Sequence, residues 1–252
     1  MKLLMQLLFY GFVVILAVTF LYMEWNEQPV IARKVFPTGY YKIVMDQTVE
    51  NEPRQLIDAP LIKQLPELPR GCEVTSLAML LAHAGAHVDK MTLAKQLKKD
   101  PTPMKIVNGK IYFGNPNTGF VGSLYSYKKP GLGVYHKPIA DLAEKYLPGR
   151  IKDLSGTSFD TVTDYLDKGR PVWVIVSSTY KKVPDTEWVT WETRSGAIRV
   201  TKKEHAVLLT GYEKDNVFFN DPLTGRKNAK APKRDFLEAW HQFGSQAITY
   251  VD

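Results

Sequence analysis

The most informative stretch of this sequence reads Pro69-Arg70-Gly71-Cys72-Glu73-Val74-Thr75-Ser76-Leu77-Ala78-Met79-Leu80-Leu81. Beyond the cysteine, apolar residues recur at helical spacing, at Val74, Leu77, Ala78 and Leu81. Gly85 suits the position just past the end of such a helix. The pattern predicts a largely buried helix that carries Cys72 in its first turn.

Cys72 is the only cysteine in the chain, which excludes an intramolecular disulfide and a cysteine-based zinc cage. A lone cysteine is more often a buried small hydrophobe than a nucleophile. A helix N-terminus, however, lowers the pKa of a thiol and offers backbone N–H groups to an oxyanion. Gly71 would let the backbone turn tightly before the helix. These residues alone leave both interpretations open.

A cysteine nucleophile needs a base, and His205 is the strongest candidate among the five histidines. It directly precedes a predicted buried strand, where it could face a cleft while the strand anchors its backbone. The alternative is an exposed residue at the end of a strand. The remaining histidines suit surface, packing or cleft-border positions: His83, His87, His136 and His241.

Two further side chains complete the candidate site. Asp221 ends a strand predicted to pair with the strand after His205 through a turn at residues 213–216, so its carboxylate could orient the imidazole. Asp221 also begins an Asp-Pro turn, and both roles can hold together. Gln64 lies upstream of Cys72 and could donate to an oxyanion, although an amide in a Pro-rich loop is usually just solvated.

The rest of the body reads as helices followed by strands. Helices are expected at residues 89–99, 138–146, 158–168 and 236–241, and strands at 171–176, 187–191, 197–201, 206–212, 217–221 and 247–251. Residues 56–62 suit an edge strand or an extended lead-in. Residues 105–134, rich in Gly, Asn, Pro and Tyr, suit a long ordered loop beside a substrate groove. This order predicts an α+β fold ending in an antiparallel sheet.

The N-terminus predicts a membrane anchor. Leu3 to Met23 is apolar apart from Gln6 and Thr19, long enough to span a bilayer, and without a small-residue cleavage site. The alternatives are a cleaved signal peptide and a buried core helix. We expect a signal anchor at residues 1–25, a stalk or linker at 26–55 and the main domain at 56–252. Lys2 before the segment predicts a single-pass protein whose domain lies outside the cytoplasm.

The formal net charge of +7 at pH 7 suits weak attraction to anionic surroundings such as lipid headgroups or acidic cell-wall polymers. A solvated basic surface is the simpler explanation. Lys/Arg runs interleaved with aromatic residues are missing from the sequence, so nucleic acid is not an expected partner. No feature of the sequence predicts an oligomeric state.

Several blocks together resemble the C39-like peptidases of the papain-like superfamily, in the branch found as bacterial secreted or membrane-anchored proteins. The first block is Pro60 to Leu81, around Cys72. The later blocks are Gly119-Phe120-Val121-Gly122, Gly133-Val134-Tyr135, His205 to Tyr212 and Asn220 to Gly225. They follow the family's order over residues 56–252, and several blocks are more specific than one.

The resemblance implies a papain-like α+β fold with Cys72 as nucleophile, His205 as base and then acid, and Asp221 as orienter. It carries Gln64 over as oxyanion donor, although its spacing to Cys72 is wider than in the transporter-linked relatives. It also implies that no metal or cofactor is needed. We expect Gly119, Phe120, Val121, Gly122 and Tyr135 to contact the substrate.

The predicted function is therefore cleavage of an amide bond in a peptide or protein, cell-wall peptide included, by a membrane-anchored cysteine peptidase. Leader-peptide processing is not expected, because the sequence has no Walker-type motif and no multi-span region. Two alternatives stay open. One is a non-catalytic peptide- or wall-binding module on the same fold, and the other is a cysteine-dependent acyl transferase or cross-linking enzyme.

Overall fold

A six-stranded antiparallel sheet forms the centre of residues 56–252, the part of the chain that this computed structural model describes. From one edge to the other, its strands are β11 (Arg226–Pro232), β10 (Asn216–Asp221), β9 (Glu204–Tyr212), β6 (Val172–Ser177), β12 (Ala247–Tyr250) and β5 (Ile151–Asp153). All residues of β6 are buried, as its continuous apolar run requires for a central strand. The sheet confirms the predicted antiparallel C-terminal part.

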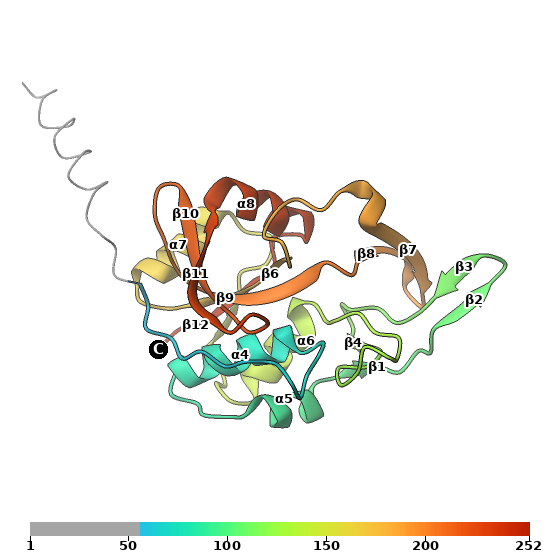
Figure 1. Cartoon of the computed structure of the whole chain (residues 1–252). Helices are drawn as coiled ribbons and strands as arrows, with labels where there is room; N and C mark the ends of the chain where they lie inside the picture. The colour runs from blue at the N-terminus through green and yellow to red at the C-terminus, as the bar shows by residue number, and fades with distance from the viewer. Residues whose placement is uncertain (1–55) are drawn as a thin grey trace, which may run out of the picture. The chain divides into compact units, whose positions relative to one another are not determined.

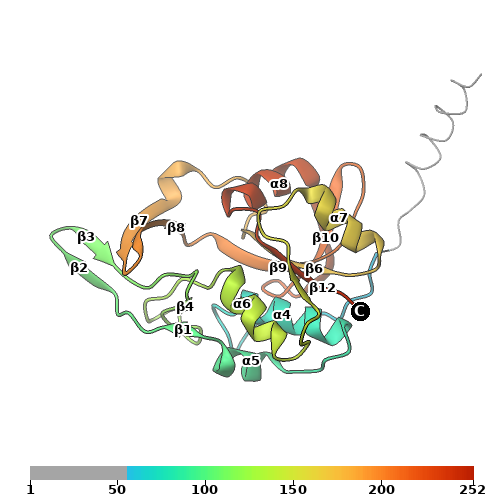
Figure 2. The same ribbon diagram turned by 180° about the vertical axis from the view of Figure 1, so that it is seen from behind.

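Helices cover both faces of this sheet (Figures 1 and 2). On one face lie α4 (Cys72–His83) and α6 (His136–Glu144), with the short α5 (Lys90–Gln96) beside α4. On the other face lie α7 (Phe159–Asp167) and α8 (Lys233–Gln242). The main hydrophobic core fills the space between the helices and the sheet, and its largest fully buried side chains include Trp173 and Trp240.

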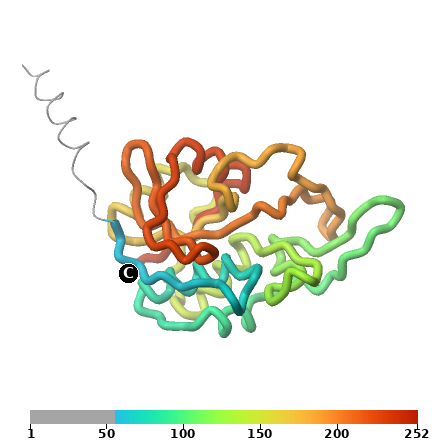
Figure 3. Tube along the Cα trace, viewed as in Figure 1, coloured from blue at the N-terminus to red at the C-terminus, as the bar shows by residue number. Residues whose placement is uncertain are grey.

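A smaller sheet extends to one side of the main sheet, in the order β2 (Lys105–Val107), β3 (Lys110–Tyr112), β7 (Trp188–Thr193) and β8 (Gly196–Thr201). The β2–β3 hairpin projects from the body, as the tube in Figure 3 shows. A two-stranded parallel pair joins β1 (Lys99–Asp100) to β4 (Phe120–Val121), and a short 3₁₀ helix covers Asp185–Glu187. The smaller sheet has its own apolar cluster, formed by Phe113, Val121, Trp191 and Val200.

The strongest patterns give the right elements. The helix at Cys72 is confirmed, and Gly85 follows it with φ of +86°. The strands around residues 171–176, 187–191, 197–201, 217–221 and 247–251 are also confirmed, as is the hairpin through the turn at residues 213–216. The predicted helix at 89–99 is shorter, because Asp89 caps it and it ends at Gln96. The predicted helix at 138–146 begins earlier, at His136.

Two expectations need correction. The segment 105–134 is not a continuous loop, because it contains β2, β3 and β4. The strand expected from residue 206 begins at Glu204, so His205 lies inside it and not before it.

Of the two alternatives for residues 56–62, the structure shows the lead-in. This segment forms no regular strand, although the Ile57 N–H donates to the Thr210 carbonyl over 2.8 Å. The edge strands β5 and β11 were not predicted, because short or largely polar edge strands carry little hydrophobic periodicity.

The predicted anchor and linker, residues 1–25 and 26–55, lie outside the described residues. Across residues 56–252, none of the helices has the length and apolar character needed to cross a bilayer.

The tight turn before α4 yields a first prediction. A Cβ at Gly71 would lie 2.4 Å from Cβ of the fully buried Leu68, an atom fixed to the backbone. We expect Gly71→Ala to lower the free energy of unfolding by about 1–3 kcal/mol, because overpacking forces the turn to shift. Urea unfolding followed by circular dichroism measures the effect.

The matched control for this prediction is Gly149→Asn. Gly149 has φ of +75°, and a Cβ at that position would have no neighbouring atom within 4 Å. Asparagine tolerates this backbone conformation. Equal unfolding midpoints for Gly71→Ala and the wild type would contradict the packing argument.

Candidate active site

The first turn of α4 is fixed to the central sheet by two buried hydrogen bonds. Ser76 Oγ donates to the Ala206 carbonyl of β9 over 3.0 Å, and Trp173 Nε1 of β6 donates to the Glu73 carbonyl over 3.0 Å. Because both strands are central and buried, these contacts hold the start of the helix beside β9. Cys72, the first residue of α4, is thereby fixed in position.

Cys72 belongs to the main hydrophobic core and also contacts polar groups. Its sulfur lies against the backbone N–H of Ala206 on β9, and its side chain is 7% exposed. The N-cap residue Gly71 supplies no side-chain hydrogen bond, whereas Asp89 and Ser158 cap α5 and α7. Gly71 therefore leaves the Cys72 N–H without a side-chain cap, and this N–H remains available for an oxyanion.

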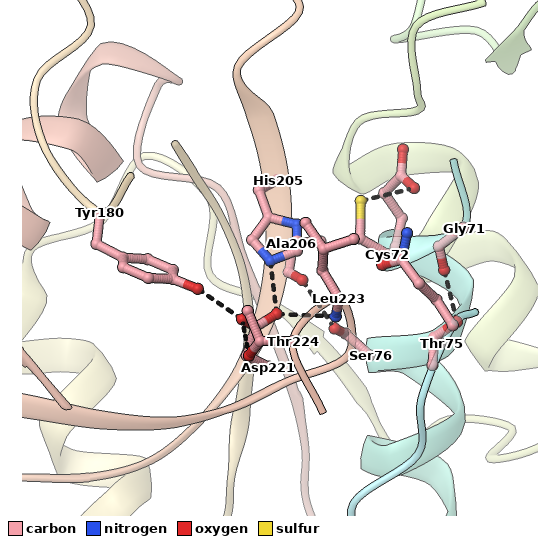
Figure 4. A network of polar contacts seen from close by, with 12 residues as sticks. Gly71, Cys72, Thr75, Ser76, Tyr180, His205, Ala206, Asp221, Leu223 and Thr224 are labelled. Carbon is pink, nitrogen blue, oxygen red and sulfur yellow. Dashed lines mark hydrogen bonds and ion pairs between the residues drawn. The ribbon is translucent and has the colours of Figure 1, made fainter. Parts of the chain in front are cut away.

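His205 connects the cysteine side of the site to Asp221. Its Nε2 lies 2.9 Å from Asp221 Oδ1, and both side chains are buried. The hairpin register pairs Asn220 with Leu208, which brings the beginning of β9 to the end of β10. Figure 4 shows the other ring nitrogen, Nδ1, directed toward Cys72. The structure therefore brings together the three residues that the sequence analysis selected.

Asp221 is held as a carboxylate by several donors (Figure 4). Oδ2 accepts from Tyr180 Oη over 2.7 Å and from Thr224 Oγ1 over 2.5 Å, and Oδ1 accepts from the Leu223 N–H over 2.9 Å. Burial by itself would raise the pKa of this carboxyl. The hydrogen bond and charge of His205, with the two hydroxyls, outweigh burial and hold the pKa below its usual value.

Tyr180 is a site residue that the sequence analysis missed. Its φ is +58°, in the left-handed region that a bulky side chain seldom adopts. Such a conformation costs about 1–3 kcal/mol and concentrates at functional sites. Here it accompanies the hydrogen bond from the hydroxyl to Asp221. No periodicity marks this residue in the sequence, because the contact depends on the loop that follows β6.

Gln64 lies in the interior and is 2% exposed, and its side-chain amide is hydrogen-bonded to the loop that precedes α4. Its Nε2 donates to the Pro69 carbonyl over 3.0 Å, and its buried Oε1 has no hydrogen-bond partner. The amide has a second N–H, which leaves one hydrogen for an oxyanion, so its role as oxyanion donor stays a prediction.

Four of the five residues predicted to contact substrate occupy buried positions, and the fifth, Gly122, is exposed. Phe120 and Val121 are fully buried in the main core and the smaller core, so their side chains do not line a groove. A Cβ at Gly119 or Gly122 would meet backbone atoms within 2.7 Å or 2.3 Å, so both glycines serve close chain packing. Tyr135 is 8% exposed, and burial followed by the charge of Glu204 raises the pKa of its hydroxyl.

The comparison with known proteins assigns the family. The model of the Peptidase_C39 like family matches residues 56–248. This chain belongs to that family. The C39-like domain is 44% identical over 194 residues to the uncharacterized protein YvpB of Bacillus subtilis, covering 76% of this chain and 74% of YvpB. The family and the α+β C39-like fold expected from the sequence are thus confirmed.

A solved structure supports the same C39-like fold. It is a crystal structure from Bacillus anthracis of a protein assigned by inference as a C39-like peptidase. It is 45% identical to this chain, with a TM-score of 0.73, and the match covers 78% of this chain and 97% of the solved one.

The C39-like site also contains two carboxyl groups that the sequence analysis did not select. Glu73 Oε2 lies 3.3 Å from Cys72 Sγ. One oxygen of Glu73, one oxygen of Glu204 and the Cys72 sulfur all lie within 4.8 Å of one another. Within residues 56–252 this trio is the only group of His, Cys, Asp and Glu close enough to hold a metal ion. A signal was available, because Glu73 follows Cys72 and Glu204 precedes His205.

Burial raises the pKa of both carboxyls. For Glu73 it reaches about 7, and for Glu204 the charge of Glu73 raises it further. The folded protein therefore keeps protons that the unfolded chain has released. The free energy of unfolding then falls as pH rises from the ordinary glutamate value of 4.5 to about 7.

We expect Glu204→Gln to flatten this fall, because it removes one of the two carboxyls whose pKa is raised in the folded protein. Asp221 has a lowered pKa, so its contribution to the free energy of unfolding is lost as pH falls, and only below about pH 4. Urea unfolding at a series of pH values measures the slope. The exposed Glu238→Gln on α8 is the matched control, and an unchanged slope in Glu204→Gln would contradict the explanation.

Proposed function

We propose that this C39-like chain is a cysteine peptidase that hydrolyses an amide bond with Cys72 as nucleophile, His205 as base and acid, and Asp221 as orienter. The observation that carries this proposal is the position of one buried imidazole. Its Nε2 is hydrogen-bonded to Asp221 and its Nδ1 is directed toward Cys72. A nucleophile, a base and an orienter in this order are typical of acyl transfer to cysteine.

The proposed reaction has two steps. In the first, the Cys72 S–H proton passes to His205 Nδ1, the sulfur bonds to the carbonyl carbon, and the C–N bond breaks as the imidazolium protonates the leaving amine. In the second, water gives a proton to His205 and its oxygen attacks the thioester. The C–S bond breaks, the thiolate regains the proton, and a carboxylic acid leaves. Asp221 keeps the imidazole oriented and stabilises its charged form.

The start of α4 suits the negative charge that forms on the carbonyl oxygen. The Cys72 N–H lies in the first turn of α4, at the positive end of the helix dipole, and the N-cap residue Gly71 supplies no side chain to occupy it. Gln64 is a second candidate donor through its remaining amide hydrogen, since the buried side chain is already fixed by Pro69. These donors stabilise the transition state more than the substrate, which is what accelerates the reaction.

We propose a peptide or protein substrate, including cell-wall peptide, met outside the cytoplasm. The apolar run from Leu3 to Met23 supports a single-pass anchor, and the net charge of +7 suits an anionic envelope. Hydrolysis is preferred to a pure binding role because the imidazole, the carboxylate and the uncapped helix start converge beside one thiol. Transfer to an amine acceptor would use the same thioester, and added primary amine would then give adducts.

The first functional prediction concerns the nucleophile and the base. We expect Cys72→Ala and His205→Ala to lower peptide hydrolysis more than about 10³-fold, because each removes an essential member of the reacting unit. Cleavage of a peptide library followed by mass spectrometry measures the loss. His241→Ala, an exposed histidine on α8, is the control and should retain activity. Full activity of folded Cys72→Ala would contradict the proposal.

A second functional prediction concerns Asp221. We expect Asp221→Asn to lower kcat by about 10²–10⁴-fold with little change in KM, because the amide favours the wrong imidazole tautomer. Steady-state kinetics on a cleaved library peptide measures both constants. The exposed Asp185→Asn serves as control. A change confined to KM would instead assign Asp221 to substrate binding.

A further inference from the structure

Two buried carboxyl groups beside Cys72 have no part in the proposed reaction. Glu73 is 1% exposed, and its two oxygens are occupied on different sides. Oε1 accepts from the Val134 N–H over 2.8 Å, and Oε2 lies 3.3 Å from the Cys72 sulfur. Glu73 therefore touches the atom that the mechanism requires to become an anion.

Glu204 faces the same small space from β9. Its Oε1 is buried without a hydrogen-bond partner. A Cβ placed on Gly133 would lie 2.4 Å from Glu73 Oε1 and 2.5 Å from Glu204 Oε2, so both carboxyls occupy room that a side chain at this position would fill. The glycine permits the two acids to come together.

Within the part of the chain that the structure describes, no positive side chain compensates this pair. Among the ion pairs of residues 56–252, none joins Glu73 or Glu204 to a lysine or arginine. Two carboxylates this close in a desolvated space cannot both ionise near neutral pH, because each charge opposes the other and water does not screen them. The raised pKa values of both groups agree with this geometry.

The other titratable groups around the pair are few. Cys72 faces it from α4, and Tyr135 faces Glu204 from the segment before α6. His205 follows Glu204 on β9, and its Nε2 is hydrogen-bonded to Asp221 on the far side of the ring. The thiol is thus the acid whose ionisation responds most directly to the charge of the pair. After burial, the charges of Glu73 and Glu204 are the next largest causes that raise the pKa of this thiol.

We propose that Glu73 and Glu204 are both protonated at mildly acidic pH, and that loss of the Glu73 proton sets the upper end of the pH range in which Cys72 can form its reactive thiolate. The inference rests on the proposed function, since it treats Cys72 as the nucleophile. While the pair is protonated, its O–H can donate to the thiolate and its charge does not oppose the sulfur. When the pair ionises, the negative carboxylate beside the sulfur disfavours the thiolate and its ion pair with His205.

In this arrangement each proton has a defined place. The thiol proton moves to His205 Nδ1, and the pair keeps its own protons and takes no part in bond breaking. Glu73 acts on the sulfur directly, and Glu204 keeps its proton in the same space because burial and the charge of Glu73 both oppose its ionisation. Peptide hydrolysis should therefore be favoured on the acidic side, with its alkaline limit set by the pair.

The test is the pH dependence of alkylation of the full chain by iodoacetamide. Cys72 is the only cysteine, so the loss of iodide and the formation of the S–C bond report this sulfur alone. In the wild type we expect a rate maximum at mildly acidic pH and a fall of about tenfold as the pair ionises, which is one pK unit of thiol acidity. At strongly alkaline pH the alkylation rate should rise again, because the thiol then loses its proton directly to the solvent.

The two variants should change the profile in different ways. Glu73→Gln removes the charge beside the sulfur, so the fall should disappear. Glu204→Gln leaves Glu73 beside the sulfur, where burial still favours its protonated form, so a fall should remain near neutral pH. Glu238→Gln is the matched control and should match the wild type. A merely structural role would change the rates of both variants by similar factors at every pH and would leave the fall in Glu73→Gln.

A profile that rises steadily with pH in the wild type, and that neither substitution alters, would overturn the inference. If a variant does not fold, infrared spectroscopy of the wild type decides the same question. A protonated carboxylic acid band should persist at neutral pH and shift in D₂O, and its absence would also overturn the inference. Alkylation needs no peptide substrate, so loss of the hydrolysis proposal and loss of this inference give different results.

Discussion

The site depends on one packing contact, the first turn of α4 against the central strands β6 and β9. Ser76 and Trp173 make the two buried hydrogen bonds across that contact. The helix brings Cys72, β9 brings His205, and the hairpin to β10 brings Asp221. Each side chain belongs to a rigid element whose other residues are in the hydrophobic core. The chemistry therefore needs no mobile loop to place its three central groups.

Burial has two opposite effects at this site. It strengthens the hydrogen bonds that hold Asp221 as a carboxylate, because several donors surround it. It also opposes charge on Cys72, on Glu73 and on Glu204, which have no cation beside them among the described residues. A protonated carboxyl pair reconciles a buried thiol with a reaction that needs its thiolate. The same burial that excludes water thus makes the reactivity of Cys72 depend on pH.

The sequence predicts those parts of the fold that carry a strong local pattern. The helix at Cys72 and the apolar strand β6 follow from periodicity, and the contact of His205 with Asp221 follows from a hairpin turn. The polar edge strand β11 lacks such a pattern, because its neighbours and not its own residues define it. Phe120 and Val121 belong to conspicuous glycine-flanked motifs but fill the cores, since such motifs mark close packing as well as substrate contact.

The remaining site residues depend on contacts between distant parts of the chain. Glu73 and Glu204 meet only because α4 and β9 pack together around Gly133. Tyr180 reaches Asp221 through a loop with a left-handed residue. Neither feature has a local signature. Acidic residues next to both the nucleophile and the base are the one sequence signal that points toward the pair.

The central claim is that the Cys72 sulfur attacks a carbonyl carbon at the start of α4 while His205 faces the reacting atoms. A crystal structure of the protein treated with a peptide aldehyde tests it most directly. The account predicts a bond from Cys72 Sγ to the aldehyde carbon, the new oxygen at the Cys72 N–H, and His205 Nδ1 within hydrogen-bond distance of the adduct. An aldehyde that binds without bonding to the sulfur, or an adduct beyond reach of the imidazole, would contradict it.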